Sequence, residues 1–509
     1  MPGRISGKPC PHKRLTLAFR CARCGLPLPL SQRENYLLSG AYYVSRASRR
    51  ASKKLIVFLD LDNTLLEAHH RRNSPLPPER VVTVDEAREA LEQPLRDESG
   101  DSFLRQYCDA AEKYFFDPED PELRGIRRWV VAPECDCAIC FRPGVFRWLY
   151  LLQTLADVYI STTGTQDYAA LISRIIDPRR LYVLSIFARE TADSVGDKTI
   201  AQSVCGEVLE VKAETETQKG SNILYKGANR HIGSDKALYS VVIDDSSTPW
   251  AGTTCAFLKS LDFIYLNPDY AGRCLRQQFP LPTGLGEDEP EALYCYGDFP
   301  LLSLDGNPRE RVLLLRDALE AQLRAFSNLV KEMAEAVCPV DGKEPMGAAQ
   351  YLRERSRAYH IFEGCTFYIP RLGNGDCRLD PTGKQVLEVR WPSRVETGVE
   401  APIDFRVRVI LAFGGKVAHE YGEDVSHVLY RPSNARATWE HCKGRLTKNP
   451  DTLPTNKRLL AYGDASSPGP AQGLAVVSQD WLLLSTHLYC RQPEDPYTAE
   501  FLRLVSLRE

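Results

Sequence analysis

The 509-residue chain lacks long hydrophobic runs, and no stretch approaches the roughly 18 consecutive apolar residues that a membrane helix requires. Its polar start, MPGRISGKPC, also lacks the apolar segment of a secretory signal peptide. We therefore expect an intracellular protein with no membrane partner. The sequence contains no internal repeat and no extended low-complexity tract either.

A large excess of charge of one sign is also absent, because the formal net charge is −3. This balance argues against a general nucleic-acid-binding surface, so we do not expect direct binding of nucleic acid. The charge is unevenly spread, since residues 1–56 hold twelve Lys or Arg and a single acid, Glu34. The basic arm at 1–54 could attract phosphorylated partners, act as a nuclear address, or simply be a solvated surface.

Cysteine is too sparse for a disulfide framework: sixteen cysteines are scattered over the chain, as expected for free thiols in a reducing compartment. One pattern near the start stands apart. Cys10-x-His12 and Cys21-x-x-Cys24 could hold zinc, since two thiolate or imidazole pairs near one loop can complete a tetrahedron. The same residues could instead form a metal-free knuckle.

What the chain does have is an alternation of apolar strands and amphipathic helices after Leu55, which predicts a mainly parallel sheet of the α/β class. At 509 residues the chain exceeds one hydrophobic core, so we expect two or three domains. Helices are predicted over 145–155 and 171–176. Strands are predicted in the apolar run after Leu55, at 157–163 and at 240–243.

Two polar inserts, at 69–125 and 192–227, interrupt this alternation. We interpret them as surface excursions from the sheet, the first partly helical around 109–114, that could form a cap or a peptide groove. An acidic linker follows, and then a long amphipathic helix that starts at Pro308. The final unit is predicted to contain strands at 365–369, 405–411 and 425–430.

The segment LIVFLDLDNTLLEA, residues 55–68, places Asp60 and Asp62 at the end of a predicted buried strand, with Thr64 two residues on. The carboxyl end of a parallel strand is where α/β sheets bind ligands. Asp-x-Asp-x-Thr there suits covalent phosphoryl transfer, in which the first Asp attacks phosphorus and the second handles the leaving-group proton. The alternative is an acidic turn that caps the next helix.

An attacking carboxylate and a phosphate repel each other by about 4 kcal/mol per unit charge pair at 4 Å and an effective dielectric near 20. Cations must therefore share the pocket, and Mg²⁺ is the natural choice beside carboxylate and phosphate oxygens. Asp60, the backbone carbonyl of Asp62 and Asp245 could supply its protein ligands. Asp245 belongs to an Asp-Asp pair that closes the predicted strand at 240–243.

Three further residues could bind the phosphoryl group itself. Thr162, near the end of the second strand, offers a hydroxyl, and Gly164 allows backbone N–H groups to approach a phosphoryl oxygen. An ammonium group could come from Lys226, or from Lys236 as the second choice. Each feature alone is weak, but the ordered set is more specific.

This ordered set resembles the haloacid dehalogenase superfamily, and more narrowly the Fcp-type phosphatases of the RNA polymerase II carboxy-terminal domain. The motifs that carry the resemblance are LDLDNTL at 59–65, RPG at 142–144, STTGTQDYA at 161–169, Asp177-Pro178, Lys226 and VVIDDSSTPW at 241–250. The resemblance implies a Rossmann-like α/β phosphatase core with insertions. It also implies a nuclear protein that acts on a phosphorylated polymerase tail or a similar phosphoprotein.

The resemblance also implies a role for each matched residue. Asp60 would become phospho-aspartate, and Asp62 would protonate the departing serine or threonine oxygen and then activate water. Thr162 and Lys226 would bind the phosphoryl group, and Asp244 would orient Lys226. Asp245 would complete the Mg²⁺ site. The expected substrate-binding residues are Thr64, Arg142, Gly164 and Asp177.

The carboxy-terminal unit resembles a BRCT domain, a small α/β fold that binds protein partners. Its signs are Gly414-Gly415, SHVLY from Ser426, and a later segment with Trp481 and Tyr497. Some such domains read phosphopeptides, but Trp481 is expected chiefly in the core.

The predicted domains are therefore the arm at 1–54, a phosphatase domain at 55–275, an acidic linker with a long helix at 276–358, and a BRCT domain at 359–509. We predict a Mg²⁺-dependent phosphoserine/phosphothreonine phosphatase of the aspartate type. Two alternatives remain: a catalytically weak scaffold that binds phosphoproteins, and a small-molecule phosphatase of the same superfamily.

Overall fold

The computed structural model describes residues 55–70, 78–117, 126–189, 239–263, 308–370 and 405–506, apart from short breaks, and four further strand fragments of two residues each. The chain divides into two compact units. Unit 1 comprises Met1–Ala256 and Ala334–Ala348, and unit 2 comprises Phe257–Met333 and Ala349–Glu509. The basic arm at 1–54 and the second insert at 192–227 lie outside the described residues.

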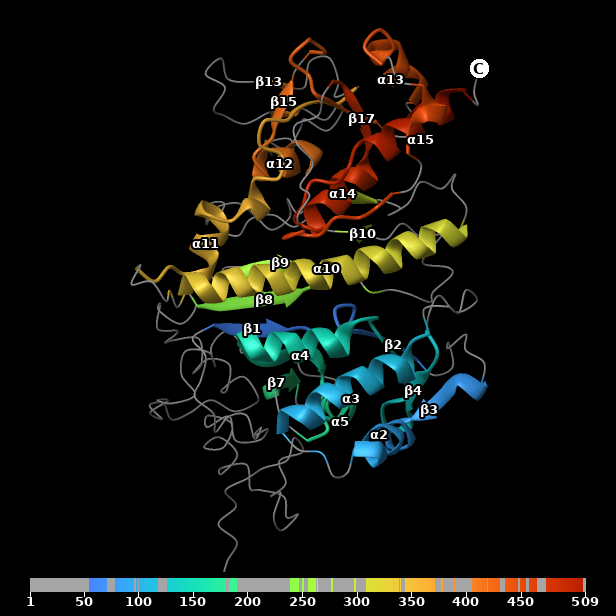
Figure 1. The fold of residues 1–509 in the computed structure, drawn as a ribbon, viewed down its shortest axis with the longest axis vertical. Coiled ribbons are helices and arrows are strands. Elements are labelled where there is room, and N and C mark those ends of the chain that lie inside the picture. The colour runs from blue at the N-terminus through green and yellow to red at the C-terminus, as the bar shows by residue number, and fades with distance from the viewer. Residues whose placement is uncertain are drawn as a thin grey trace, which may run out of the picture. The chain divides into compact units, whose positions relative to one another are not determined.

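Unit 1 contains a parallel sheet whose central strand is the apolar run after Leu55 (Figure 1). In the order β7-β6-β1-β8, its strands are Val183–Arg189, Asp157–Thr165, Ile56–Leu59 and Ser240–Asp244. Leu59 is in register with Ile160 on one side and Ile243 on the other, so the three strands end at one edge of the sheet. The predicted parallel α/β sheet is confirmed.

Two helices that pack against this sheet also match the sequence pattern. Helix α4 spans Val145–Leu155 and α5 spans Gln166–Ile176, and both pack against β6. Thr165 caps α5, because its side chain accepts a hydrogen bond from the Tyr168 N–H at 3.4 Å. The helix ends before Asp177-Pro178, as a residue that precedes proline disfavours the helical region.

The first insert folds into ordered structure within unit 1. A second sheet has the order β2-β5-β4-β3, with strands Leu66–His70, Cys137–Phe141, Trp129–Ala132 and Val81–Thr83. Helices α2, Val84–Glu92, and α3, Gly100–Phe115, accompany it. The helix expected around 109–114 is present within α3, and Phe103, Tyr107 and Ala111, which recur every fourth residue, form its buried face.

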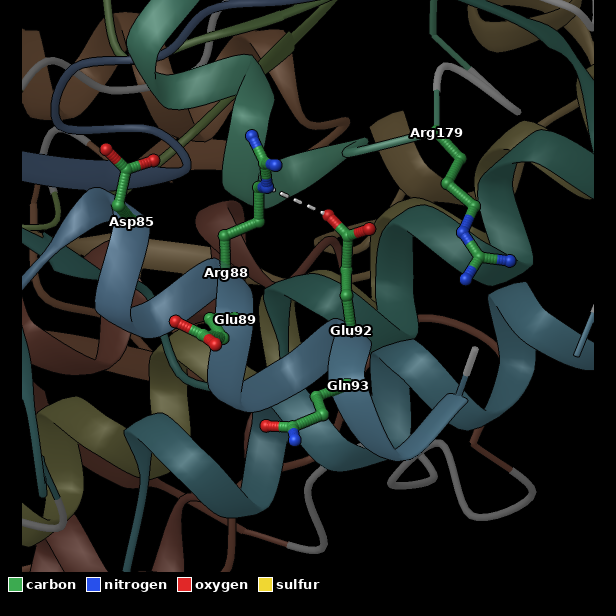
Figure 2. A pocket seen from close by; sticks show the side chains of 6 residues that line it. All are labelled: Asp85, Arg88, Glu89, Glu92, Gln93 and Arg179. Atoms are coloured by element: carbon green, nitrogen blue, oxygen red, sulfur yellow. Dashed lines mark ion pairs between the residues drawn. The ribbon is translucent and has the colours of Figure 1, made fainter. Parts of the chain in front are cut away.

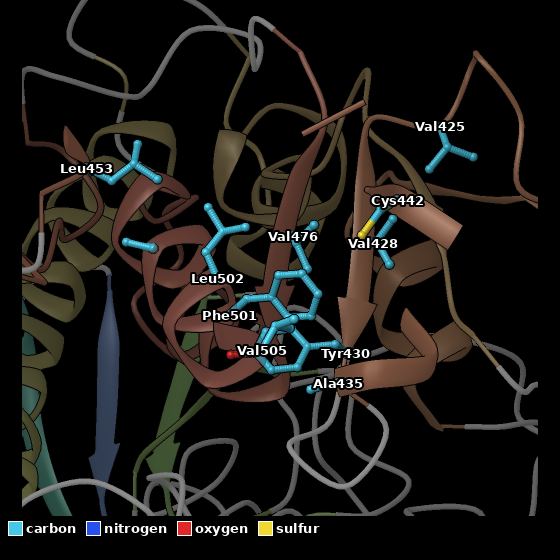
Figure 3. Close-up of a cluster of buried hydrophobic side chains, with 11 residues drawn as sticks. Val425, Val428, Tyr430, Ala435, Cys442, Leu453, Val476, Phe501, Leu502 and Val505 are labelled. Atoms are coloured by element: carbon cyan, nitrogen blue, oxygen red, sulfur yellow. The ribbon is translucent and has the colours of Figure 1, made fainter. Parts of the chain in front are cut away.

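Unit 2 contains a four-stranded parallel sheet in the order β15-β12-β16-β17, with strands Lys416–Ala418, Thr366–Tyr368, His427–Tyr430 and Ala475–Ser478. Its helices are α12 at Phe405–Ala412, α13 at Ala435–Cys442, α14 at Gln479–His487 and α15 at Asp495–Ser506. Figure 3 shows its core, in which the Tyr430 ring lies 4.9 Å from that of Phe501. Trp481 is fully buried, as expected.

One expected strand of this unit is wrong, because residues 405–411 lie in helix α12. The alternation in FRVRVIL favours a strand, yet these residues form a helix whose Val407, Val409 and Ile410 are buried. Gly414 follows the helix with φ +82°, the left-handed conformation that commonly ends helices. The strands expected around 365–369 and 425–430 are present as β12 and β16.

The long helix expected after Pro308 is present as α10, Pro308–Val337. Most of its residues belong to unit 2, and its last four fall in the 334–348 segment of unit 1. Within unit 2, the Gln322 amide accepts the Leu261 N–H at 2.8 Å and donates to the Lys259 carbonyl at 3.0 Å. No helix among the described residues is long and apolar enough to cross a membrane.

The core of unit 2 holds a buried histidine. His427 is fully buried on β16, and its ring centroid lies 4.8 Å from that of Phe367. Its Nδ1 lies 2.8 Å from Ser426 Oγ and its Nε2 lies 3.5 Å from Glu494 Oε1. Burial lowers the pKa of His427 from its ordinary 6.5, although the hydrogen bond with Glu494 opposes this shift.

Because the folded pKa of His427 is lowered, its contribution to stability is present above pH 6.5 and is lost as the pH falls through the folded pKa. We expect unit 2 to lose stability between pH 7.5 and 5.5, at most about 1.4 kcal/mol per pH unit from this group. Urea unfolding followed by hydrogen exchange of the β16 peptide measures this loss. In His427→Phe the slope should be smaller, and an unchanged slope would contradict the assignment.

Candidate active site

Three aspartates meet at the carboxyl edge of the parallel sheet. Asp60 follows β1, Asp244 ends β8, and Asp245 comes next in the chain. One carboxylate oxygen from each lies within 4.8 Å of the others. Asp60 is 3% exposed and Asp244 is fully buried, whereas Asp245 is half-buried. The structure thus brings together the strand ends from which the sequence predicts chemistry.

Such a cluster is electrostatically costly without a cation. Two ionised carboxylates about 5 Å apart repel by roughly 3 kcal/mol at an effective dielectric near 20. A hard divalent cation offsets this repulsion, and carboxylate oxygens are the ligands that such ions prefer. Among the described residues, the aspartates are the only group of three or more potential ligands close enough to share an ion. The donor set therefore fits a hard divalent metal.

The loop that carries Asp60 and Asp62 is folded onto one carbonyl. The N–H groups of Leu65 and Leu66 donate to the Leu61 carbonyl at 2.8 and 3.1 Å, and the Asp60 N–H donates to Ile243 at 3.0 Å. Asn63 adopts φ 60°, a left-handed conformation that Asn tolerates better than most residues. The loop therefore places two carboxylates at the edge with little freedom.

Thr64 ties this loop to the neighbouring strand. Its hydroxyl accepts the Asp245 N–H at 3.1 Å and lies 3.4 Å from the Asp245 carboxylate, and its side chain is buried. Thr64 thus holds the loop against Asp245, and its contact with substrate remains a prediction.

Tyr168 is a site residue that the sequence interpretation did not single out. Its hydroxyl donates to Asp62 Oδ1 at 2.5 Å, while Thr162 Oγ1 donates to Oδ2 at 3.4 Å. Burial and the Asp62 charge raise the pKa of Tyr168 well above its ordinary value, so the phenol stays protonated and donates. The signal in the sequence is an aromatic hydroxyl in the first turn of the helix that follows β6.

Gly164 makes room for that tyrosine. A Cβ at this position would lie 2.7 Å from Tyr168 Cδ1 and 3.2 Å from Thr162 Oγ1, so a side chain would displace the ring. The Gly164 N–H donates to Thr162 Oγ1 at 3.0 Å. The close approach expected here is therefore made by Tyr168, and an approach to phosphate remains a prediction.

Asp244 is held by two donors within unit 1. Its Oδ2 accepts the Trp250 Nε1–H and its Oδ1 accepts the Ser246 N–H, each at 2.7 Å. Trp250 is buried and was also not singled out from the sequence. Lys226 and Lys236 lie outside the described residues, so the orientation of Lys226 by Asp244 remains a prediction. The same holds for zinc at Cys10, His12, Cys21 and Cys24.

Arg142 supports the aspartate loop from the protein interior. Its side chain is fully buried, and its Nη1–H donates to the Thr64 carbonyl at 3.2 Å while its backbone N–H donates to Leu65 at 2.9 Å. Burial lowers the pKa of Arg142 to about 9. The structure therefore shows Arg142 in contact with the loop, and its contact with substrate remains a prediction.

Asp177 lies at the opposite edge of the sheet from the three aspartates. It follows the last residue of α5 and accepts the Val183 N–H at 2.9 Å. Val183 begins β7 and is in register with Val158 near the start of β6, so this is the amino-terminal edge. Helix α5 thus separates Asp177 from the three aspartates, and its substrate-binding role remains a prediction.

A separate polar pocket lies along α2, with a volume of about 310 Å³ (Figure 2). Its lining residues are Asp85, Arg88, Glu89, Glu92, Gln93 and Arg179. Arg88 and Glu92 form an ion pair of 3.1 Å within it. No predicted site residue lines this pocket, so it does not belong to the aspartate site.

The aspartate cluster predicts divalent-cation binding that depends on Asp245. Asp245→Asn removes one negative charge from the cluster, and we expect Mg²⁺ affinity to fall by about tenfold or more. Isothermal titration calorimetry with MgCl₂ measures the change. Asp109→Asn, which removes an exposed carboxylate on α3, should bind Mg²⁺ as the wild type does. Equal affinity in wild type and Asp245→Asn would contradict the cluster as a metal site.

Comparisons with known proteins find one matching family model and several similar solved structures. The family model described as NLI interacting factor-like phosphatase matches residues 55–204. Two solved structures of the RNA polymerase II CTD phosphatase Fcp1, one of them the fission yeast protein bound to beryllium fluoride, are 15% and 16% identical to this chain. Each match covers 87% of this chain and 95% of the other, with TM-scores of 0.37 and 0.36.

A third structure, the HAD-hydrolase YfnB from Bacillus subtilis bound to magnesium, is 13% identical, with a TM-score of 0.19. That match covers 43% of this chain and 92% of the other. A search of curated proteins found no match. The phosphatase family model thus matches the segment that carries Asp60, Asp62 and Thr162, in agreement with the phosphatase expected from the motifs.

Proposed function

We propose that this chain is a Mg²⁺-dependent protein serine/threonine phosphatase that acts through an aspartyl-phosphate intermediate. The substrate that the Fcp-type motifs favour is the phosphorylated carboxy-terminal domain of RNA polymerase II. One observation carries the proposal: within a phosphatase domain, Asp60 lies at the carboxyl end of the central strand in a cluster of three carboxylates.

In the first step, a carboxylate oxygen of Asp60 attacks phosphorus as the bond to the serine or threonine oxygen breaks. Asp62 gives its proton to that departing oxygen, and the products are acyl phosphate on Asp60 and a free hydroxyl. In the second step, water attacks the phosphoryl group while Asp62 takes a proton from it. Inorganic phosphate leaves, and the Asp60 carboxylate is restored.

The cation site fits this chemistry. Asp60, Asp245 and the backbone carbonyl of Asp62 would hold Mg²⁺, which when bound would reduce the repulsion between the carboxylates and the phosphate dianion. Asp244, fixed by Trp250, would then be available to orient a lysine, for which Lys226 is the proposed residue.

The hydrogen bonds to Asp62 fit a group that alternates between proton donor and acceptor. Tyr168 and Thr162 each donate to a different carboxylate oxygen, which fixes the plane of the Asp62 carboxyl group. Thr162 would also bind a phosphoryl oxygen, as the motif resemblance implies. A fixed acid near the leaving oxygen increases the rate of proton transfer.

We further propose that residues 359–509 form a BRCT domain that binds a protein partner. The parallel sheet β15-β12-β16-β17 with its helices and the buried Trp481 support a small α/β domain there. Nuclear residence is proposed from the Fcp-type resemblance and the basic arm. Zinc binding by Cys10, His12, Cys21 and Cys24 is proposed from their spacing.

Replacement of the nucleophile tests the proposal directly. Asp60→Asn should release no phosphate from an aryl phosphate or from singly phosphorylated polymerase-tail peptides, a loss of about a thousandfold or more. EDTA should abolish wild-type release. The exposed Asp109→Asn on α3 serves as the matched control and should keep full activity.

Each other outcome of this assay decides against part of the proposal. Retained turnover in Asp60→Asn removes the assigned nucleophile, and activity in EDTA removes the metal. Faster hydrolysis of sugar phosphates than of phosphopeptides favours the small-molecule phosphatase. A wild type that binds phosphopeptides but does not release phosphate favours the scaffold.

Loss of the Tyr168 hydroxyl tests the assignment of Asp62. Tyr168→Phe keeps the ring but removes the donor to Asp62, so we expect kcat to fall by about ten- to a hundredfold with KM little changed. The matched control is Tyr107→Phe, which removes another buried hydroxyl of unit 1, bonded to the Ile175 carbonyl. Equal kcat values for both variants in a steady-state phosphate-release assay would show that Tyr168 does not act through Asp62.

A further inference from the structure

Helix α4 starts without a capping side chain of its own. Its N-cap is Gly144, at φ 85°, and no side-chain cap is made by that residue. The first N–H groups of an α-helix have no partner within the helix and must find acceptors elsewhere. Gly144 is the last residue of the RPG motif, so the start of α4 is also the end of the segment that contacts the aspartate loop.

The missing cap comes from helix α3 in the first insert. Glu112 Oε2 accepts the Gly144 N–H at 3.1 Å, and Oε1 accepts the N–H groups of Phe146 and Arg147 at 2.9 and 3.3 Å. Glu112 is 8% exposed. A carboxylate at a helix amino terminus is stabilised by the helix dipole as well as by these donors. One buried side chain of the insert therefore replaces a local cap.

The start of α4 is connected by hydrogen bonds to the loop that carries Asp60 and Asp62. The Val145 N–H donates to the Arg142 carbonyl at 3.1 Å, which closes the turn between the motif and the helix. Arg142 in turn donates from its guanidinium to the Thr64 carbonyl at 3.2 Å and from its backbone to Leu65 at 2.9 Å. Thr64 then accepts the Asp245 N–H. Hydrogen bonds thus connect Glu112 to the loop between Asp60 and Leu66 through a single buried turn.

We propose that Glu112 is a positioning residue for the phosphatase reaction: by holding the start of α4, it fixes Arg142 against the loop that carries Asp60 and Asp62. This gives α3 of the polar insert a role in catalysis through the loop, without contact with substrate. The inference rests on the proposed function, because its main readout is turnover.

The groups around Glu112 determine at which pH its carboxylate is ionised and can cap α4. Asp109 and Arg147 form an exposed ion pair of 2.8 Å nearby, and burial of the Cys108 thiol raises its pKa and keeps it protonated. Burial also raises the pKa of Glu112 to about 7, against the lowering effect of its three backbone donors. Because only the ionised carboxylate can accept all three N–H groups, the cap should be complete above pH 7 and weakened below it.

The test compares Glu112→Ala and Glu112→Gln with two controls on α3. Leu104→Ala removes a buried side chain without touching the cap, and Asp109→Asn removes only the exposed ion pair. With aryl phosphate and Mg²⁺, we expect kcat per folded protein to fall about tenfold in Glu112→Ala and about threefold in Glu112→Gln, with KM within twofold of wild type. Gln should retain two of the three accepted hydrogen bonds.

The pH profile separates positioning from general destabilisation. The ratio of wild-type to Glu112→Gln kcat should be larger at pH 8 than at pH 6, because only the wild-type group ionises in this range. Both controls should keep wild-type kcat per folded protein. The proposal would be overturned if Glu112→Ala and Leu104→Ala both lost activity only in proportion to their loss of folded protein.

Hydrogen–deuterium exchange of the full chain provides a readout that does not need activity. In Glu112→Ala, the amides of Leu65 and Leu66, which donate to Leu61, should exchange faster than in wild type and in both controls. An inactive wild type with this faster exchange would contradict the proposed function and leave the positioning role standing. Unchanged exchange and unchanged kcat in an active enzyme would overturn the positioning role alone.

Discussion

In unit 1, the parallel sheet holds three aspartate carboxylates close together although their negative charges repel one another. Asp60, Asp244 and Asp245 are attached to two adjacent strands whose apolar residues are buried, so their backbone positions are set by the core. Separating the charges would require breaking the register of β1 and β8. The energy of hydrophobic burial thus maintains an arrangement of like charges, and a cation or a proton is the means left to neutralise it.

Around these carboxylates, donors from several elements restrict their orientation. Tyr168 from α5 fixes Asp62, Trp250 fixes Asp244, and Thr64 joins the loop to the start of the segment after β8. Tyr168 and Trp250 are themselves largely buried, so their positions are determined by packing. Preorganised donors of this kind reduce the reorganisation needed when charge moves during reaction.

Much of this could be predicted from sequence because the strand ends carry local signals. Apolar runs that end in Asp60 and Asp244 fix both the strands and the edge at which those residues meet. Tyr168 could not be found in the same way, since its contact with Asp62 joins two elements that are distant in sequence. The position of Asp177 at the opposite edge of the sheet could not be predicted either, because a motif match does not tell at which end of a helix a residue lies. The strand expected at 405–411 failed where tertiary packing outweighed an alternating pattern of β-branched residues.

The packing of Tyr168 over Gly164 has a consequence for genetics. A Gly164→Ala allele would introduce no charge and remove no functional group, yet its Cβ would lie 2.7 Å from Tyr168 Cδ1, so the phenol ring that donates to Asp62 would have to shift. Such an allele would disturb Asp62, although the residue that it replaces has no side chain. The space beside the α-carbon of Gly164 is thus part of what positions that carboxylate.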